Sequence, residues 1–254
     1  MTLAAVTTPD ATGALDVPPG WRQGRGAFGG LVVASLVRSI EQRVADPSRK
    51  VRSVTAELLA PVAAGVAQIS VEVLRRGNNV TIARAAIAEH AHVVAVLATE
   101  RKGAGPTAWQ DLVAPVVAAH SAIEPLAASP VFPEFAQHFE YRLARGAPGD
   151  GSTETVGWIR ARDPGAPRDA AYIAALIDAW WPVALVRLAA PRAMATLAYT
   201  LDIVAGIDGL SPDAPLLYRG TAPVCSDGYC LETRELWGED GRLVALNQQT
   251  FVVF

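Results

Sequence analysis

The chain has 254 residues, of which 51% are hydrophobic and 19% are charged, and its formal net charge at pH 7 is -3. The high apolar fraction excludes a disordered chain, and the weak negative charge argues against partners such as nucleic acid or an anionic membrane surface. The first residues lack a signal-peptide pattern, and no stretch approaches the roughly 20 apolar residues of a membrane span.

The chain begins with a segment rich in proline, glycine and threonine that extends to about Gln23, with one strand expected near Leu15. Gly24 to Gly30 then matches the GxGxxG pattern of dinucleotide-binding loops. That pattern needs a buried strand directly before the glycines, and residues 18–20 are Pro-Pro-Gly instead. We therefore interpret the glycines as positions where the backbone at a helix N-terminus comes close to a strand or a ligand.

A long helix is predicted over residues 28–44, with its first two turns apolar on every side. This pattern is typical of a helix that other elements wrap around. Four strands are predicted next, over residues 51–60, 66–75, 79–88 and 93–101. Short turns separate them, which favours an antiparallel meander that curls around the helix.

The densest run of prolines and glycines lies between residues 103 and 133, which predicts a linker with a short helix around residues 111–120. The second part of the chain repeats the plan of the first. Its predicted elements are strands at 135–144 and 155–162, a helix at 169–181, and strands at 194–205, 216–223, 229–237 and 242–253. The predicted domains are therefore residues 1–102, the linker 103–133, and residues 134–254.

The two halves can be overlaid on each other by hand. Residues 53–57 lie over 198–202 as the first strand after each helix, and residues 93–96 lie over 243–246 as the last strand. In this overlay Thr99 corresponds to Gln249. Two copies of one unit are therefore expected, with their sheets joined edge to edge because open sheet edges are a liability.

The second predicted helix carries one conspicuous polar residue, Asp178. It is the only charged residue between Ala170 and Val186, and Pro182 stops or kinks the helix just beyond it. A carboxylate among apolar neighbours is costly unless it is hydrogen-bonded or has a chemical role. Asp178 is therefore either a candidate catalytic group or a buried acid whose hydrogen bonds are satisfied.

The strand after this helix alternates between two faces. Leu197, Tyr199, Leu201 and Ile203 are expected on one face, and Thr196, Ala198, Thr200 and Asp202 on the other.

The cysteines and histidines predict neither a disulfide nor a metal site. Cys225 and Cys230 are too few for a disulfide framework and form no CxxC motif, so we expect reduced, buried residues on neighbouring strand positions in a cytoplasmic protein. The four histidines show no spacing to cysteines or acids that would suggest zinc.

In order and spacing, several short segments together resemble the double-hotdog acyl-CoA thioesterases, the group that includes the bacterial acyl-CoA thioesterase II. The resemblance covers nearly the whole chain. It implies an α+β double hotdog, with two tandem units that each wrap an antiparallel sheet around a long helix. The matching segments are Gly29-Gly30, Leu74-Arg75-Arg76-Gly77, Gly157-Trp158-Ile159-Arg160, Leu176-Ile177-Asp178-Ala179 with Pro182, Thr200-Leu201-Asp202, and residues 240–245 followed by Gln248-Gln249.

This resemblance implies an acyl-CoA substrate that is hydrolysed to a free acid and CoA without a cofactor or metal. It assigns Asp178 as the general base, with Thr200 and Gln249 holding the attacking water. Backbone N–H groups at a helix N-terminus are expected to meet the oxyanion. The resemblance also implies a homo-oligomer, a dimer or tetramer. The substrate-binding residues that it implies are Gly29, Gly30, Arg76 and Gly77.

Several alternatives remain open at this level. Asp202 shares a strand face with Thr200 and could be the base, but it recurs as Glu57 in the first unit and so reads as a framework acid. Gln248 adjoins Gln249, and only the family register, four residues after Ala245, favours the latter.

Other reaction classes are disfavoured. No GxSxG motif of a Ser-His-Asp hydrolase is present, and no histidine follows Asp178, as one does in hotdog hydratases. Trp180-Trp181 is bulkier than the family pattern and is expected to reshape the acyl pocket. A non-catalytic protein that binds an acyl-CoA or another acyl ligand is the alternative function.

Overall fold

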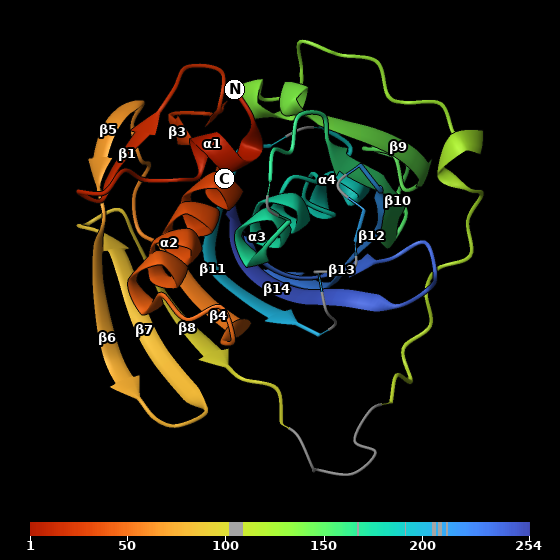
Figure 1. Ribbon diagram of the computed structural model, residues 1–254. Coiled ribbons are helices and arrows are strands. Elements are labelled where there is room, and N and C mark those ends of the chain that lie inside the picture. Colours follow the sequence, from red (N-terminus) through yellow and green to blue (C-terminus); the bar gives the residue numbers. More distant parts are fainter. Residues whose placement is uncertain (102–108, 167, 191, 205–206, 208–209, 212) are drawn as a thin grey trace.

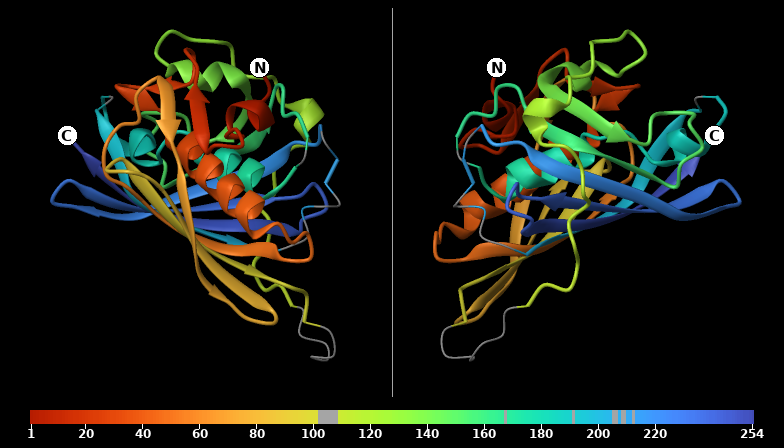
Figure 2. Two further views of the ribbon diagram at one scale, coloured as in Figure 1. Left: turned by 60° about the vertical axis from the view of Figure 1, so that its left-hand side comes forward. Right: turned by 90° about the vertical axis from the view of Figure 1, so that its right-hand side faces the viewer.

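A curved antiparallel sheet of ten strands lies against two helices, α2 (Gly29–Val44) and α3 (Ala170–Asp178), which pack side by side (Figure 1). Both views in Figure 2 show the sheet as one curved layer on the same side of the helices. This computed structural model describes residues 1–101, 109–166, 168–190, 192–204, 207, 210–211 and 213–254.

The ten strands run in the order β6-β7-β8-β4-β11-β14-β13-β12-β10-β9, and each of these described pairings is antiparallel. Strands β4 and β11 pair at the middle, so elements from the two halves of the chain share one sheet. The strands are β4 (Lys50–Leu58), β6 (Ser70–Arg76), β7 (Val80–Ile87), β8 (Ala91–Ala98), β9 (Phe139–Arg145), β10 (Glu154–Ala161), β11 (Met194–Ile203), β12 (Leu216–Ser226), β13 (Tyr229–Trp237) and β14 (Leu243–Val253).

Several smaller elements accompany the large sheet and the two helices. Strand β1 (Ala14–Val17) pairs with β5 (Gly65–Gln68), and β2 (Arg22–Gln23) pairs with β3 (Gly26–Ala27). The short helices are α1 (Leu3–Val6), α4 (Ala184–Arg187) and the 3-10 turns η1 (His120–Ala122) and η2 (Glu134–His138). Within the described ranges, none of the helices has the length and apolar content that a bilayer crossing requires.

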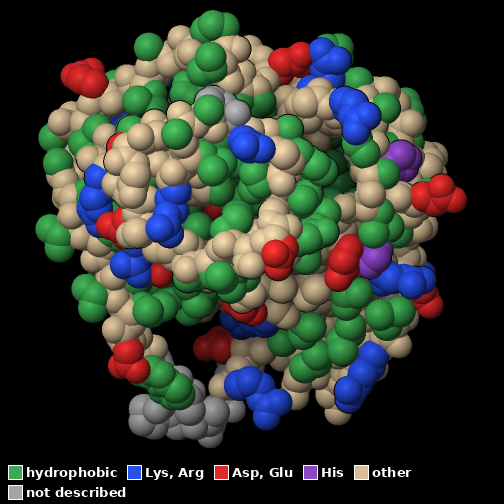
Figure 3. All heavy atoms as spheres, turned by 180° about the vertical axis from the view of Figure 1, so that it is seen from behind, with side chains coloured by type: hydrophobic (Ala, Val, Ile, Leu, Met, Phe, Trp, Pro, Cys, Tyr) green, Lys and Arg blue, Asp and Glu red, His purple; other side chains and the backbone are tan. Residues whose placement is uncertain are grey.

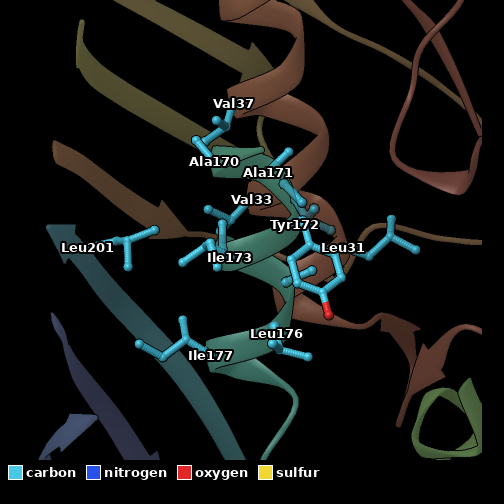
Figure 4. Packing of buried hydrophobic residues seen from close by; sticks show 14 of the residues in the cluster. Leu31, Val33, Val37, Ala170, Ala171, Tyr172, Ile173, Leu176, Ile177 and Leu201 are labelled. Atoms are coloured by element: carbon cyan, nitrogen blue, oxygen red, sulfur yellow. The ribbon is translucent and has the colours of Figure 1, made fainter. Parts of the chain in front are cut away.

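Helix α2 is buried on almost every side because the sheet and α3 surround it, as its all-round apolar first turns predict. Figure 4 shows Leu31, Val33 and Val37 of α2 among the side chains of α3. Alanines such as Ala170 and Ala171 on α3 let the two helix backbones approach closely. Each square ångström of apolar surface removed from water in this way stabilises the fold by about 25 cal/mol.

An ion pair joins the two helices near one end of their contact. The guanidinium of Arg38 on α2 donates to the carboxylate of Asp169, the N-cap residue of α3, at 2.9 Å. Glu41, one turn further along α2, is half-buried beside this pair. Burial, together with the negative charge of Asp169, raises the pKa of Glu41 to about 7.

Replacing Glu41 with glutamine is expected to flatten part of the pH dependence of stability. Between the ordinary value of 4.5 and about 7, native Glu41 holds a proton that the unfolded chain has lost, so the free energy of unfolding falls as pH rises through this window. The full loss is at most about 3 kcal/mol. Urea unfolding on either side of the window measures it. An equal loss in wild type and Glu41→Gln would contradict the assignment, and Glu72→Gln, an exposed carboxylate paired with Arg84, is the matched control.

The helix predicted around residues 111–120 is wrong. Residues 109–119 have no regular secondary structure, and the single turn η1 begins directly after them at His120. Pro115 disfavours the helical conformation of the residue before it. Instead, Val117 and Ile123 pack on Trp158 and Trp237, so the segment of residues 109–123 covers the side of β10 that faces away from α3. The predicted linker also includes residues 102–108, which lie outside the described residues.

The prediction of two reduced cysteines is also wrong. Cys225 on β12 and Cys230 on β13 lie directly opposite each other and are joined by a disulfide, and Cys225 is exposed rather than buried. The tight turn at Asp227-Gly228 brings the two residues together, because an antiparallel hairpin pairs positions on both sides of its turn. Motif spacing alone does not reveal such a cross-strand pair.

Candidate functional site

Asp178 is the last residue of α3, and its side chain lies against the first turn of α2 with 8% of its surface exposed. A Cβ atom added to Gly29 would lie 3.1 Å from Oδ2 of Asp178, and one added to Gly30 would lie 2.9 Å from its Cβ. Only residues without a side chain leave room for this approach. The glycines at residues 29 and 30 therefore let a carboxylate reach the positive end of the α2 dipole.

Two side chains donate to the same oxygen of Asp178. Nε2 of Gln249 lies 2.7 Å from Oδ1, and Nη1 of Arg234 lies 3.1 Å from it. Burial raises the pKa of Asp178, while Arg234, Gln249 and the backbone N–H of Gly30 oppose that rise. Asp178 is therefore a buried carboxylate with one oxygen fully engaged and the other, Oδ2, turned toward α2.

Gln249 on β14 is 1% exposed, and both ends of its amide are engaged. Its nitrogen donates to Asp178 and to Oδ1 of Asn247 at 3.1 Å, and its oxygen accepts from the hydroxyl of Thr196 at 3.1 Å. These bonds set the orientation of the amide. The neighbouring Gln248 is exposed, so the structure places Gln249, and not Gln248, beside Asp178.

The structure does not bring Thr200 to Asp178. Thr200 is exposed, and its hydroxyl donates to the carbonyl of Gln248 at 3.4 Å. The register between β11 and β14 shifts between Thr196 and Ala198. Such a bulge moves a residue to the other face of a strand, so Thr196 joins the buried face of Tyr199 while Thr200 stays outside. Among these two threonines, Thr196 is therefore the one whose hydroxyl bonds to Gln249.

The rival acid, Asp202, lies on the same outer face as Thr200. It is exposed and stands opposite Ser53 of β4 in the sheet. It takes no part in the contacts of Asp178 that the structure shows among its described residues.

Arg76 and Gly77 close the far end of α2. Nη2 of Arg76 donates to the carbonyl of Val44 at 2.7 Å, and the carbonyl of Gly77 accepts from Arg49 at 2.9 Å. Because α2 has 16 residues, this end lies about 24 Å from the glycine pair that borders Asp178. The structure thus brings Gly29 and Gly30 to Asp178 but does not bring Arg76 and Gly77 there.

A buried ion pair on β13 was not singled out from the sequence. Glu232 is 0% exposed and Arg234 is 2% exposed, and Nε of Arg234 lies 2.7 Å from Oε1 of Glu232. Both side chains share a face with Cys230 and Leu236, which are buried. Two charged residues at alternate positions of a strand whose other inward residues are apolar are the sequence signal that could have identified them.

An apolar cavity of about 560 Å³ opens beside the turn that follows Asp178. Tyr141 connects the cavity with the site, because its hydroxyl donates to the carbonyl of Ala179 at 2.9 Å. Burial, and in smaller part the charge of Asp178, raise the pKa of Tyr141. The lining contains no charged side chain among the described residues. The residues that line it are Gln23, Val131, Phe132, Pro133, Phe135, Ala136, Tyr141, Pro148, Gly149, Ala179, Trp180, Trp181, Pro182, Leu185, Leu188 and Ala189.

Neither sign of charge dominates the face seen in Figure 3. Hydrophobic side chains gather over the centre of this face, and acidic and basic side chains are scattered around them. The described residues also contain no group of three or more histidine, cysteine or acidic side chains that could hold a metal ion.

The sequence matches the acyl-CoA thioesterase C-terminal domain over residues 113–253 and the acyl-CoA thioesterase N-terminal domain over residues 17–100. The chain belongs to the acyl-CoA thioesterase family. No curated protein matches the chain. Asp178, Arg234 and Gln249 lie in the C-terminal thioesterase domain and the glycine pair lies in the N-terminal one, so the candidate site forms where the two family domains meet.

Solved structures show the same fold. A conserved protein of unknown function with a hot dog fold from Alicyclobacillus acidocaldarius has a TM-score of 0.88 at 23% identity, covering 99% of this chain and 97% of that one. The TesB protein of Mycobacterium avium subspecies paratuberculosis has a TM-score of 0.80 at 15% identity, covering 99% and 98%. The acyl-CoA thioesterase II TesB2 of Mycobacterium marinum has a TM-score of 0.74 at 20% identity, covering 95% and 92%. The thioesterase-family chain therefore has a hotdog fold.

Proposed function

We propose that this chain is an acyl-CoA thioesterase that hydrolyses an acyl-CoA to a free acid and CoA. The observation that carries the proposal is the bonded series Thr196, Gln249 and Asp178 at the N-terminus of α2, in a chain of the acyl-CoA thioesterase family. A thioester is reactive enough for direct attack by water, provided that the water is held in place and partly deprotonated. The three side chains are of the types that this reaction requires.

Asp178 is the general base in this proposal. Its Oδ2 is turned toward α2, and it would take a proton from the water as the water attacks the carbonyl carbon. Gln249 and Thr196 would orient the same water, and Thr196 takes the role that the family resemblance assigned to Thr200. The tetrahedral intermediate would then collapse with cleavage of the C–S bond, and the leaving CoA thiolate would take up the proton held by Asp178. No covalent enzyme intermediate is needed.

The oxyanion would form at the N-terminus of α2. The backbone N–H groups of Leu31 and Val32 donate to the carbonyl of Phe28, and that of Gly30 faces the carboxyl of Asp178 and favours its charged form. Among the described residues at this end, the N–H of Gly29 is left to donate to a ligand. A helix N-terminus also favours negative charge through its dipole, which suits an oxyanion.

The apolar cavity would hold the acyl group. Its uncharged lining, with Trp181 and Phe132 stacked at 6.3 Å between ring centroids, suits a chain without ionised groups. The carbonyl end would then lie at the turn that follows Asp178.

The register of β4 with β11 supports a double hotdog. Thr55 pairs with Thr200, Ser53 with Asp202, and Glu57 with Ala198. The sequence overlay matches residues 53–57 with 198–202 in the same order, so an antiparallel pairing centred on Thr55 and Thr200 exchanges equivalent residues. Two units related by an approximate two-fold axis between these threonines have this register.

The release of CoA across a series of acyl-CoAs of graded length tests the function. The purified chain is expected to release CoA from uncharged acyl-CoAs, because the cavity carries no charge that would pair with an ionised acyl terminus. A dicarboxylic acyl-CoA of equal length is the matched control and is expected to be a poorer substrate. Binding of acyl-CoAs without CoA release above the uncatalysed rate would instead support the alternative, a non-catalytic acyl-CoA-binding protein.

A further inference from the structure

The pair Glu232–Arg234 connects the two ends of the turn that carries Asp178. Before the turn, Nη1 of Arg234 donates to the carbonyl of Ile177 at 3.2 Å and to Oδ1 of Asp178 at 3.1 Å. After the turn, Oε2 of Glu232 accepts from the backbone N–H of Val183 at 2.8 Å. The pair therefore restrains both ends of the segment in which α3 stops.

Burial of this pair is costly, which indicates a specific use. Both side chains are almost completely removed from water, and a buried ion pair is often no more stabilising than apolar residues of similar size. The ion pair does more than fill space in the core, because Nη1 of Arg234 donates to the carboxylate of Asp178. Nη1 of Arg234 and Nε2 of Gln249 both donate to Oδ1, so Oδ2 is the oxygen that faces the glycine pair.

We propose that Arg234, held by Glu232, is a positioning residue that orients Asp178 and keeps it ionised. This inference rests on the proposed thioesterase function. Arg234 directs the Oδ2 oxygen of Asp178 toward α2, and its positive charge favours the carboxylate over the acid. Glu232 supplies the balancing negative charge, without which Arg234 would hold Asp178 as a weaker base.

The charges of the three side chains suit proton transfer. Glu232, Arg234 and Asp178 carry a net charge of one negative unit before reaction. When Asp178 accepts a proton from water, the remaining Glu232–Arg234 pair is neutral, so this step leaves no unbalanced charge on the buried side chains. The oxyanion formed in the same step lies at the N-terminus of α2.

The other titratable groups around Asp178 do not compete with this arrangement. Tyr141 on β9, Tyr199 on β11 and Tyr218 on β12 are buried, and burial raises the pKa of each phenol. On β13, burial raises the pKa of Glu232, while Arg234 opposes that rise. From α2 and β14, the structure shows the N–H of Gly30 and the amide of Gln249 facing the carboxyl.

The pH dependence of kcat/KM, measured by CoA release, tests this inference. The acid limb is the part of the profile in which kcat/KM falls as the pH is lowered. In Arg234→Gln the midpoint of this limb is expected to lie about one to three pH units higher, because an opposite charge within hydrogen-bonding distance lowers a carboxyl pKa by that amount. In Glu232→Gln the limb is expected to move down, since the positive charge of Arg234 is no longer balanced. Opposite displacements by two partners of one ion pair are not expected from a general loss of stability. Limbs that stay at the wild-type position in both folded variants would overturn the proposal.

Two further variants complete the design. Arg219→Gln breaks a different ion pair, with Glu235 on neighbouring strands, and is expected to leave the limb unchanged. If Arg234→Gln does not fold, Arg234→Lys carries the test, because an ammonium keeps the charge but cannot span Ile177, Asp178 and Glu232. The limb of Arg234→Lys is then expected near the wild-type position with kcat reduced, and an unchanged kcat would overturn the positioning role. If the wild-type protein releases CoA from no acyl-CoA, the proposed function is overturned together with this inference. If the wild-type protein is active and the limbs of the folded variants do not move, only this inference is overturned.

Discussion

Replacing Asp178 with asparagine is expected to lower the rate of acyl-CoA hydrolysis by roughly 10²- to 10⁴-fold, the usual contribution of a general base. Asparagine keeps the shape of the side chain but cannot take a proton from water. Arg234 retains Glu232 as its partner in this variant, so the fold is expected to persist. The measurement is steady-state CoA release, together with circular dichroism and binding of a non-hydrolysable acyl-CoA analogue.

This variant separates the enzyme from the non-catalytic binder. Binding of the analogue is expected to remain, because the apolar cavity and the N-terminus of α2 are unchanged. If folded Asp178→Asn protein hydrolyses its substrate at nearly the wild-type rate, Asp178 is a satisfied buried acid. The proposed mechanism would then be wrong, while the hotdog fold would stand.

Removing the amide of Gln249 is expected to have the second-largest effect. Gln249→Ala takes away a donor to Asp178 and an acceptor of Thr196, and misplacement of a reacting group by about 1 Å can cost roughly 10²-fold in rate. Thr196→Val is expected to cost less. In the double variant the two losses are not expected to add, because both side chains act on one water. CoA-release kinetics of the three variants provide the measurement.

Thr200→Val is the matched control for Thr196→Val. It makes the same chemical change on the same strand, on the outer face of the sheet, and its expected effect on kcat/KM is small. A larger loss in Thr200→Val than in Thr196→Val would contradict the placement of the site and would restore the assignment made from the family resemblance.

The sequence predicted the secondary structure best where a long run of residues followed one apolar pattern. The apolar pattern of residues 28–44 predicted α2 closely, because a helix buried on all sides needs apolar residues around its whole circumference. A short helix was predicted around residues 111–120 within the proline-rich linker, and this prediction is wrong because residues 109–119 have no regular secondary structure. Those residues instead contact Trp158 and Trp237 without regular structure, and such contacts between distant segments leave no local period in a sequence.

The helix that carries Asp178 was predicted to run to residue 181, yet α3 ends at Asp178 itself. Trp180 continued the helical spacing, but in the structure its ring stacks on Tyr218 and its indole N–H donates to Thr155. Contacts with distant strands thus end the helix three residues earlier, which places the carboxylate at the start of the turn and within reach of α2.

By itself, the sequence determined which residue types could perform chemistry and roughly where they lie. Asp178 stood out because a lone acid in an apolar helix needs a partner or a role, and the family register selected Gln249 over Gln248. The structure decided which side chains meet. A bulge in β11 lies beside Thr196, whose hydroxyl bonds to Gln249, and the register of β13 placed Arg234 against Asp178. Strand register and bulges depend on hydrogen bonds between residues far apart in the chain, so only the tertiary structure decides which face a polar residue occupies.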